Sequence, residues 1–236
     1  MSTNPFAHHL TRRAFATGLI TALPSLAKAD RAIVEPGLRL SDDSVALTLD
    51  ACSGGFDARL AQSLVEIGVP TTIFATGLWL RQNPTGLAYL LSHPAIFTLQ
   101  NHGAWHRAPV LGGGTIFGQS CARTLDDVRQ EVTDGSAALI AATGSAPRWY
   151  RGATARYSPE AVAAIEGWGF AVAGYSLNAD MGASLPGTRV AERIGRAKAG
   201  DVIIGHINQP TRSSGIGIAI GSAALHRAGM RFSRLS

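Results

Sequence analysis

Two histidines four residues apart are the clearest candidates for chemistry in this chain. His102 and His106 belong to the segment His-Gly-Ala-Trp-His. One turn of helix would place both imidazoles on the same face, with their Cβ atoms about 5 to 6 Å apart, close enough to bind one divalent cation. Two unrelated histidines that share a turn by chance are the alternative. An acidic side chain brought close by the fold would favour the metal site.

Further polar residues stand where predicted strands end. Asp50, Arg151 and His206 each close or directly follow such a strand, and Asn178 and Asp180 follow another. The carboxyl ends of parallel strands share one face of a barrel, where active sites are built, so we expect these side chains to converge in one cleft. Asn and Asp are also ordinary turn residues, which leaves a structural role for Asn178 and Asp180 equally open.

The elements that would position these side chains alternate along the chain. Apolar runs typical of buried strands are separated by amphipathic segments typical of helices. This alternation predicts an α/β fold, a distorted parallel (β/α) barrel of about seven strands, with a flexible rim loop over 107–123. The predicted strands are 45–50, 71–75, 97–99, 149–151, 170–173, 176–178, 202–205 and 230–232. The predicted helices are 57–67, 86–91, 126–142, 159–166, 190–197 and 216–228.

The first 29 residues have the pattern of an export signal. Arg12-Arg13 precedes a weakly apolar run that ends in Ala27-Lys28-Ala29, where small residues suit signal peptidase. The run is too short, and too rich in Gly and Thr, for a stable membrane anchor. We therefore expect a twin-arginine signal over 1–29, a single barrel domain over 30–236, and a periplasmic or extracellular location. A membrane-tethered leader or a disordered tail is the alternative.

Composition excludes several classes of protein. With 46% hydrophobic and 16% charged residues, the chain is not intrinsically disordered, and two cysteines cannot hold together a disulfide scaffold. Of the net charge of +5, three units come from Arg12, Arg13 and Lys28 in the predicted leader. The remaining excess of two charges, without a basic cluster interleaved with aromatics, argues against a nucleic-acid partner.

Ordered along the chain, these residues resemble the motifs of the polysaccharide deacetylases of the NodB-homology type, carbohydrate esterase family 4. Thr48-Leu49-Asp50-Ala51 is similar to the family's Thr-Phe-Asp-Asp, and the segment 102–106 to its His-Ser/Thr-x-x-His. Arg151 is what remains of Arg-x-Pro-Tyr, and 175–180 loosely resembles the segment that ends in Asp-Trp. Ile204-Gly205-His206 matches the last motif. The resemblance runs from about residue 45 to the C-terminus and implies a metal-dependent N-deacetylase on a distorted (β/α) barrel.

The resemblance also implies roles for individual residues. Asp50 would be the general base, His206 the acid that protonates the leaving amine, and Arg151 the residue that orients the base. His102 and His106 would bind the metal, and Ile204 would line the pocket for the acetyl methyl group. The expected substrate is an N-acetylhexosamine polysaccharide, chitin-like or peptidoglycan. Imidazole and carboxylate ligands suit zinc, with cobalt, nickel or iron as alternatives.

One position departs from the family pattern. Ala51 stands where the family has its metal-binding Asp, and a methyl group cannot bind a cation. Either the two histidines and water hold the ion, or Asp50 binds it, or Asp57 or Asp180 supplies the third ligand. Loss of activity is the remaining alternative, which would leave a carbohydrate-binding protein. A metal hydrolase of small amides on the same barrel is a further candidate.

Three more residues have two interpretations each. Cys52 and Cys121 could form a disulfide in an oxidising compartment, or both could be buried thiols. A nucleophilic role for Cys52 has little support, since nothing in the sequence marks its thiol for activation. Trp105 could present its ring to a sugar in the substrate pocket, although aromatic residues near a barrel mouth also serve in packing.

Overall fold

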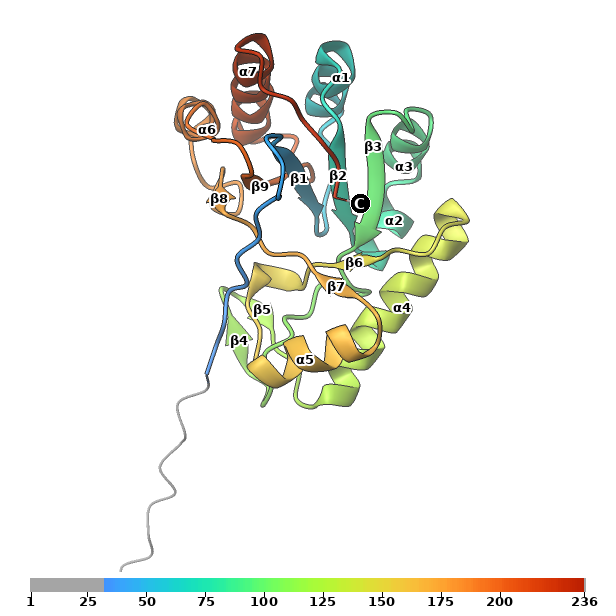
Figure 1. Cartoon of the computed structure of the whole chain (residues 1–236). Coiled ribbons are helices and arrows are strands. Elements are labelled where there is room, and N and C mark those ends of the chain that lie inside the picture. Colours follow the sequence, from blue (N-terminus) through green and yellow to red (C-terminus); the bar gives the residue numbers. More distant parts are fainter. Residues whose placement is uncertain (1–31, 236) are drawn as a thin grey trace, which may run out of the picture. The chain divides into compact units, whose positions relative to one another are not determined.

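The computed structural model describes residues 32–235, so the predicted leader over 1–29 lies outside the described residues. Seven strands form one sheet in the order β7-β6-β3-β2-β1-β9-β8, and every neighbouring pair is parallel (Figure 1). The strands are β1 (Ala46–Ala51), β2 (Thr71–Ala75), β3 (Phe97–Asn101), β6 (Trp149–Tyr150), β7 (Ala171–Val172), β8 (Leu177–Asn178) and β9 (Val202–His206).

This curled, open sheet confirms the predicted distorted barrel of about seven strands. Each of the seven strands overlaps a predicted one, and β7 and β8 are the edges that remain unjoined. The predicted strand over 230–232 is wrong, because Phe232 forms only an isolated bridge to Val45. The four long strands β1, β2, β3 and β9 are adjacent, so the middle of the sheet is regular and its margins are short.

Helices follow the strands and cover the sheet. They are α1 (Ala58–Ile67), α2 (Gly77–Gln82), α3 (Pro84–Leu91), α4 (Leu125–Thr143), α5 (Pro159–Gly167), α6 (Gly187–Ile194) and α7 (Ser214–Arg227). α6 packs on α7 and α7 on α1, whereas α4 packs on α2, β3 and α5. Thr124 and Asp127 form a capping box at the start of α4. Each side chain accepts a hydrogen bond from the backbone N–H of the other residue, so two N–H groups that the helix leaves without a partner are paired. Short α2 was not predicted.

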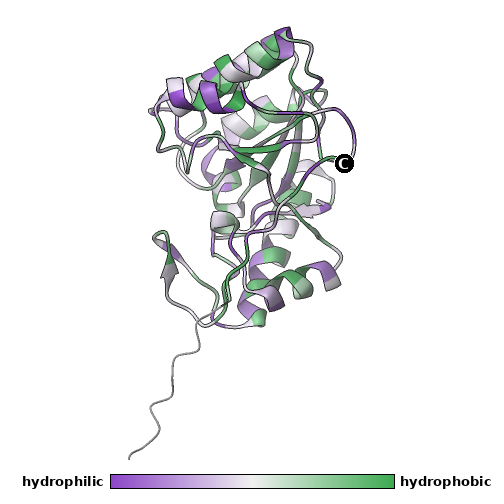
Figure 2. Cartoon of the chain, turned by 60° about the vertical axis from the view of Figure 1, so that its left-hand side comes forward, coloured by the Kyte–Doolittle hydropathy of each residue, from purple (hydrophilic) through white to green (hydrophobic). Residues whose placement is uncertain are grey.

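The hydrophobic core lies between the sheet and these helices. All six residues of β1 are buried, as a strand covered on both faces requires. Figure 2 shows mainly hydrophobic residues along the central strands and a mixture of hydrophobic and hydrophilic residues along the helices. Within residues 32–235, no helix combines the length and apolar character needed to cross a bilayer.

A small hairpin interrupts the loop predicted over 107–123. It consists of β4 (Thr115–Ile116) and β5 (Gln119–Ser120), which pair antiparallel and stand apart from the main sheet (Figure 1). Phe117 and Gly118 form its two-residue turn with φ of 49° and 77°. The hairpin is thus an ordered structure, with an aromatic residue at its tip.

Candidate metal centre and active site

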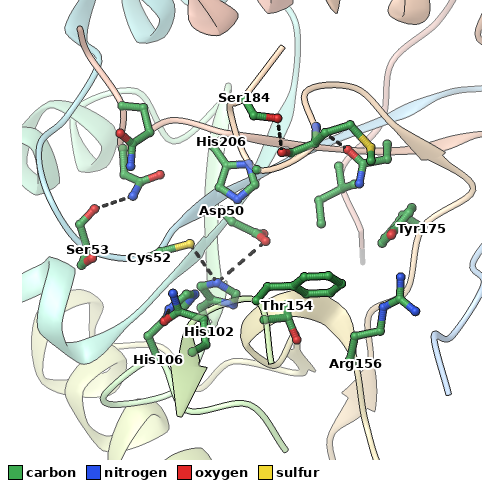
Figure 3. Close-up of a pocket in the computed structure, with 18 residues that line it drawn as sticks. Asp50, Cys52, Ser53, His102, His106, Thr154, Arg156, Tyr175, Ser184 and His206 are labelled. Carbon is green, nitrogen blue, oxygen red and sulfur yellow. Dashed lines mark hydrogen bonds and ion pairs between the residues drawn. The ribbon is translucent and has the colours of Figure 1, made fainter. Parts of the chain in front are cut away.

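Parallel strands bring the predicted site residues together at one edge of the sheet. Asp50 on β1 is the register partner of His206 on β9, and His102 directly follows β3. All three line one cavity of about 570 Å³, a size typical of ligand pockets (Figure 3). The expected convergence of these side chains at the carboxyl ends of the strands is therefore observed.

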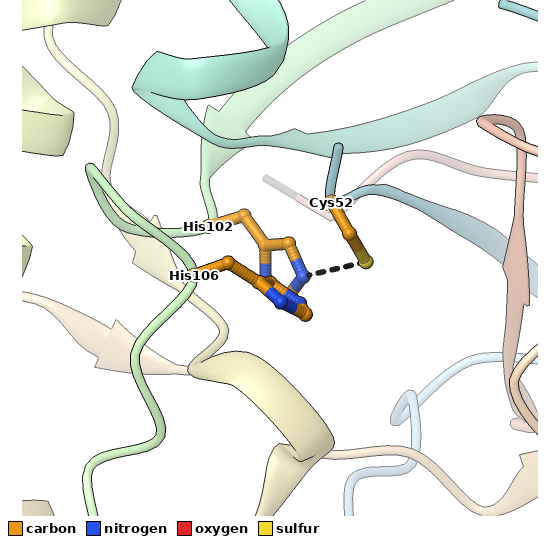
Figure 4. Close-up of side chains that lie close together, drawn as sticks. All are labelled: Cys52, His102 and His106. Atoms are coloured by element: carbon orange, nitrogen blue, oxygen red, sulfur yellow. Dashed lines mark hydrogen bonds between the residues drawn. The ribbon is translucent and has the colours of Figure 1, made fainter. Parts of the chain in front are cut away.

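Cys52, His102 and His106 form a group that could hold a metal ion (Figure 4). One ligand atom from each side chain lies within 4.8 Å of the other two. The Cys52 Sγ is 3.4 Å from His102 Nε2, and the two imidazole centres are 5.0 Å apart. Tetrahedral zinc with sulfur at about 2.3 Å and nitrogen at about 2.1 Å separates those two atoms by about 3.6 Å. The arrangement therefore fits a zinc-sized ion.

Hydrogen bonds turn both imidazoles in the orientation that metal binding needs. His102 Nδ1 donates to the Arg151 carbonyl at 2.6 Å, and His106 Nδ1 to Gln119 Oε1 at 2.9 Å. With Nδ1 holding the proton, Nε2 of each ring keeps a lone pair for a cation. Gln119 comes from β5, so the rim hairpin helps to orient a ligand of the centre.

The two histidines come together through a loop, not through the helical turn that the spacing predicts. Residues 102–107 contain no helix, and the chain reverses at Gly103 and His106, with φ of 89° and 64°. A left-handed conformation is uncommon for a residue with a side chain and requires support from its surroundings. The proximity was predicted correctly, but the reason given for it was wrong.

Glu131 of α4 supplies that support. Its Oε1 accepts the backbone N–H groups of Trp105 at 2.9 Å and Arg107 at 3.1 Å, and its carbonyl accepts that of Ala104 at 3.0 Å. A Cβ atom at Gly103 would lie only 2.3 Å from the same Oε1, so any other residue there would displace the Glu131 carboxylate from these hydrogen bonds. Burial raises the pKa of Glu131, although the backbone N–H groups oppose this rise. One buried carboxylate thus shapes the loop between the two histidines.

Asp50 is buried but remains a carboxylate. Arg151, itself fully buried, donates from one guanidinium nitrogen to Asp50 Oδ1 at 2.9 Å and to Thr48 at 2.9 Å. Burial would raise the pKa of Asp50, but the Arg151 guanidinium, with smaller contributions from His102 and His206, outweighs burial and lowers the pKa. The other oxygen, Oδ2, is 3.8 Å from Nε2 of the candidate ligand His102.

Strand alternation explains why Cys52 and not residue 51 reaches the centre. Side chains two positions apart in an extended chain point to the same side, so Cys52 shares the face of Asp50. Ala51 points into the hydrophobic core. Burial would raise the pKa of Cys52, but His102 outweighs it and lowers the pKa well below the usual value, which favours the thiolate that binds metals.

The other proposed third ligands are engaged elsewhere. Asp57 caps α1 by accepting the Leu60 N–H at 3.3 Å. Asp180 is fully buried and accepts from His206 Nδ1 at 3.0 Å. Burial would lower the pKa of His206, but the Asp180 carboxylate outweighs it and raises the pKa well above the usual value. The Asp180 carboxylate therefore favours the protonated form of His206, which can donate a proton.

The remaining predicted residues divide between the pocket and its surroundings. Ile204 and Asn178 line the cavity beside His206. Arg151 and Asp180 do not line the cavity but contact residues that do, Asp50 and His206 respectively. Trp105 is 54% exposed, does not line this cavity, and packs under the Arg81 guanidinium at 4.7 Å from the ring centre.

The disulfide suggested between Cys52 and Cys121 is not supported. Neither cysteine is in a disulfide, and both are buried as thiols. Cys52 contacts His102, while Cys121 belongs to a separate cluster with Ala108 and Val110. The pairing failed because the loop before Cys121 carries it to the hairpin and away from the end of β1.

With this geometry in place, comparison with known proteins identifies the family. Residues 38–173 match the family model described as polysaccharide deacetylase, which is more than half of the chain. The chain therefore belongs to the polysaccharide deacetylase family. No match to a curated protein was found.

Solved structures of the same fold include enzymes and a protein described as inactive. A Bc1960 peptidoglycan N-acetylglucosamine deacetylase is 18% identical with a TM-score of 0.71, covering 84% of this chain and 89% of that one. A Clostridium thermocellum acetyl xylan esterase in complex with cobalt is 22% identical with a TM-score of 0.62, and the match covers 80% of this chain and 87% of that one. A pseudoenzyme of carbohydrate esterase family 4 from Bacillus anthracis is 18% identical with a TM-score of 0.65. The match covers 83% of this chain and 64% of the length of that protein.

Sequence reasoning missed the metal-ligand role of Cys52, which it weighed only as a disulfide partner or a nucleophile, and it missed Gln119 and Glu131. Two signals could have found the first and last of them. Cys52 follows Asp50 by two residues in an extended segment, which is the spacing of a shared face. Glu131 lies among Val128, Val132 and Leu139 on the buried side of α4, where an unpaired charge would be costly. Gln119 had no such signal, because only the folded hairpin brings it to His106.

Proposed function

We propose that this protein is a metal-dependent hydrolase that removes N-acetyl groups from an N-acetylhexosamine polysaccharide. The observation that carries the proposal is the placement of Asp50, held by Arg151, and His206, held by Asp180, beside a three-ligand group in one cavity. Membership in the polysaccharide deacetylase family supports the substrate class.

Cys52, His102 and His106 would hold the metal, and Asp50 is free to act as base because it lies outside this group. A divalent cation bound there would supply Lewis acidity, which polarises an amide carbonyl and lowers the pKa of a water molecule. The thiolate and two imidazoles favour zinc or cobalt over harder cations such as magnesium. Three protein ligands with one open position are typical of catalytic zinc sites.

The protein's own residues supply the proton transfers. Asp50 accepts a proton from the attacking water, and Arg151 keeps that carboxylate ionised and oriented. As the C–N bond breaks, His206 donates its Nε2 proton to the amine nitrogen, which is otherwise a poor leaving group. Asp180 holds the His206 ring in that orientation. The products are acetate and a free amino sugar.

Acetate release tests this function. Protein lacking residues 1–29 is loaded with zinc or cobalt, incubated with oligomers of N-acetylglucosamine, and assayed for acetate and for bound metal. We expect release from the wild type and little from His206→Ala. Oligosaccharide binding without acetate release at full metal content would overturn the proposed reaction and favour an inactive, carbohydrate-binding protein. Release from small amides but not from oligomers would favour the small-amide hydrolase.

We also propose that residues 1–29 direct export by the twin-arginine route and that 30–236 form the mature domain. The motif Arg12-Arg13 and the small residues around Lys28 support this location, and a polysaccharide substrate outside the cytoplasm agrees with it. A fusion of residues 1–29 to a reporter protein, with Arg12→Lys and Arg13→Lys as the control, tests it. Export that survives the double substitution would contradict the twin-arginine assignment.

A further inference from the structure

The hairpin tip presents an aromatic ring to solvent at the pocket. Phe117 is 75% exposed and lines the cavity from the β4–β5 turn. Turns with positive φ at both central residues favour Asn, Asp or Gly at the first, and a bulky residue there is an outlier. Phe117 therefore costs the fold twice, in backbone strain and in exposed apolar surface. Such costs persist where the residue serves function.

A charged pair behind this ring holds it in place. The Arg156 guanidinium carbon lies 5.8 Å from the Phe117 ring centre, and one guanidinium nitrogen pairs with Glu35 at 2.5 Å. Figure 3 shows Arg156 and Tyr175 on the side of the pocket away from Ser53, with Asp50 and His206 between. The ring is thus supported on one face before any ligand arrives, which reduces the entropy lost on binding.

A second apolar side chain is built into the pocket in the same unusual way. Met181, in the segment between β8 and α6, is 53% exposed, has φ of 51°, and lines the cavity. Among the described lining residues outside Asp50 and the histidines, Arg156 is the one charged side chain, and Glu35 neutralises it. The side chains that line this part of the pocket are therefore a mixture of apolar and uncharged polar groups, with no net charge.

We propose that Phe117, supported by Arg156, and Met181 of the same cavity form a subsite for an uncharged sugar ring adjacent to the acetylated one. A sugar ring has an apolar C–H face, which packs on an aromatic ring, and hydroxyl edges, which suit polar neighbours. This inference rests on the proposed function and deepens it: the substrate is a neutral oligosaccharide of at least two sugars. The subsite offers no unpaired positive charge that would attract an anionic polysaccharide, because Arg156 is paired with Glu35.

The test compares N-acetylglucosamine with its tetramer on zinc-loaded protein. We expect Phe117→Asn to raise KM for the tetramer about tenfold, which is the effect of losing one aromatic contact, and to leave the monomer unchanged. Because Asn suits the turn, the same variant should melt at a higher temperature. Phe117→Trp should retain tetramer binding. Ile220→Ala, which removes exposed apolar surface on α7, is the matched control.

Calorimetric binding of the tetramer, in an Asp50→Asn background that prevents turnover, separates this proposal from the proposed reaction. An inactive protein that binds the tetramer through Phe117 would refute the reaction and support the subsite. Equal tetramer affinity of wild type and Phe117→Asn would overturn the subsite. Equal weakening of monomer and tetramer would also overturn it, since the ring would then touch the acetylated sugar.

Discussion

Asp50 and Asp180 are two buried aspartates at the same edge of the sheet, on either side of β9. Asp50 accepts a hydrogen bond from Arg151 and lines the cavity. Asp180 accepts a hydrogen bond from His206 and is fully buried. The first has its own pKa lowered by neighbouring positive charges, and the second raises the pKa of a neighbouring histidine. In the proposed reaction, identical side chains would thus prepare a base on one strand and an acid on the next.

The difference shows that the partner of a buried carboxylate decides its role. Asp50 is paired with a cation that cannot give up its proton, so it remains an acceptor that is open to the pocket. Asp180 is paired with the His206 imidazole, which can give up its proton, so the Asp180 charge favours the protonated form of His206. Substitutions on the two sides should therefore have different signatures.

Asp50→Asn should have the largest effect. An amide cannot accept a proton, so we expect kcat to fall by about 10²- to 10⁴-fold, the usual contribution of a general base. The variant also leaves Arg151 buried without a counter-charge, so a lower melting temperature is expected. Acetate release per folded molecule separates these effects. Asp57→Asn, a buried carboxylate outside the pocket, is the control, and equal losses in both variants would count against a base role.

Cys52→Ala should act on the metal and not on the acid or base. Loss of one of three ligands is expected to weaken zinc binding by about 100-fold or more. Cobalt-loaded wild type should show a thiolate-to-cobalt absorption band that Cys52→Asp lacks, even if Cys52→Asp still binds the ion. Metal content and this spectrum are the measurements. An unchanged band in Cys52→Asp would show that the thiol is not a ligand.

Asp180→Asn should shift the pH profile. His206 donates only while protonated, so activity is present below its raised pKa and is lost as pH rises through it. Removing the Asp180 charge lowers that pKa, so the alkaline limb should move to lower pH while the acid limb, set by Asp50, stays in place. We expect a loss of about 10-fold or more at neutral pH. The pH dependence of kcat/KM tests this, and an alkaline limb that does not move would contradict the pairing.

Glu131→Ala should have the smallest effect among these positions. The variant frees the backbone N–H groups of Trp105 and Arg107, so the loop that positions His102 and His106 loosens. We expect metal affinity to fall by about tenfold. Glu131→Gln retains an acceptor oxygen and should restore most of it, because burial of a neutral amide costs less than burial of a charge. Glu160→Ala, on exposed α5 surface, is the control. A metal affinity unchanged in Glu131→Ala would refute the positioning role.

The sequence was informative wherever a local pattern and a long-range one agree. Largely apolar sequences predicted the buried central strands β1, β2 and β9, because a strand covered on both faces must be mostly apolar. The order of Asp50, His102, Arg151 and His206 at strand ends predicted their meeting, since parallel strands share a carboxyl edge. The short edges were less well predicted; the run over 230–232 looked like a strand but found only one bridge to pair with.

What tertiary structure decided was which atoms meet. Composition and spacing placed two histidines near one metal, but the loop that joins them, and the Glu131 carboxylate that shapes it, arise from α4 packing against that loop. Cys52 became the third candidate ligand because β1 turns Ala51 into the core and its neighbours toward the pocket. The sequence by itself determined the family, the strands and the chemistry available. The contacts between side chains distant in sequence came from packing, because no local pattern encodes which buried groups will face each other.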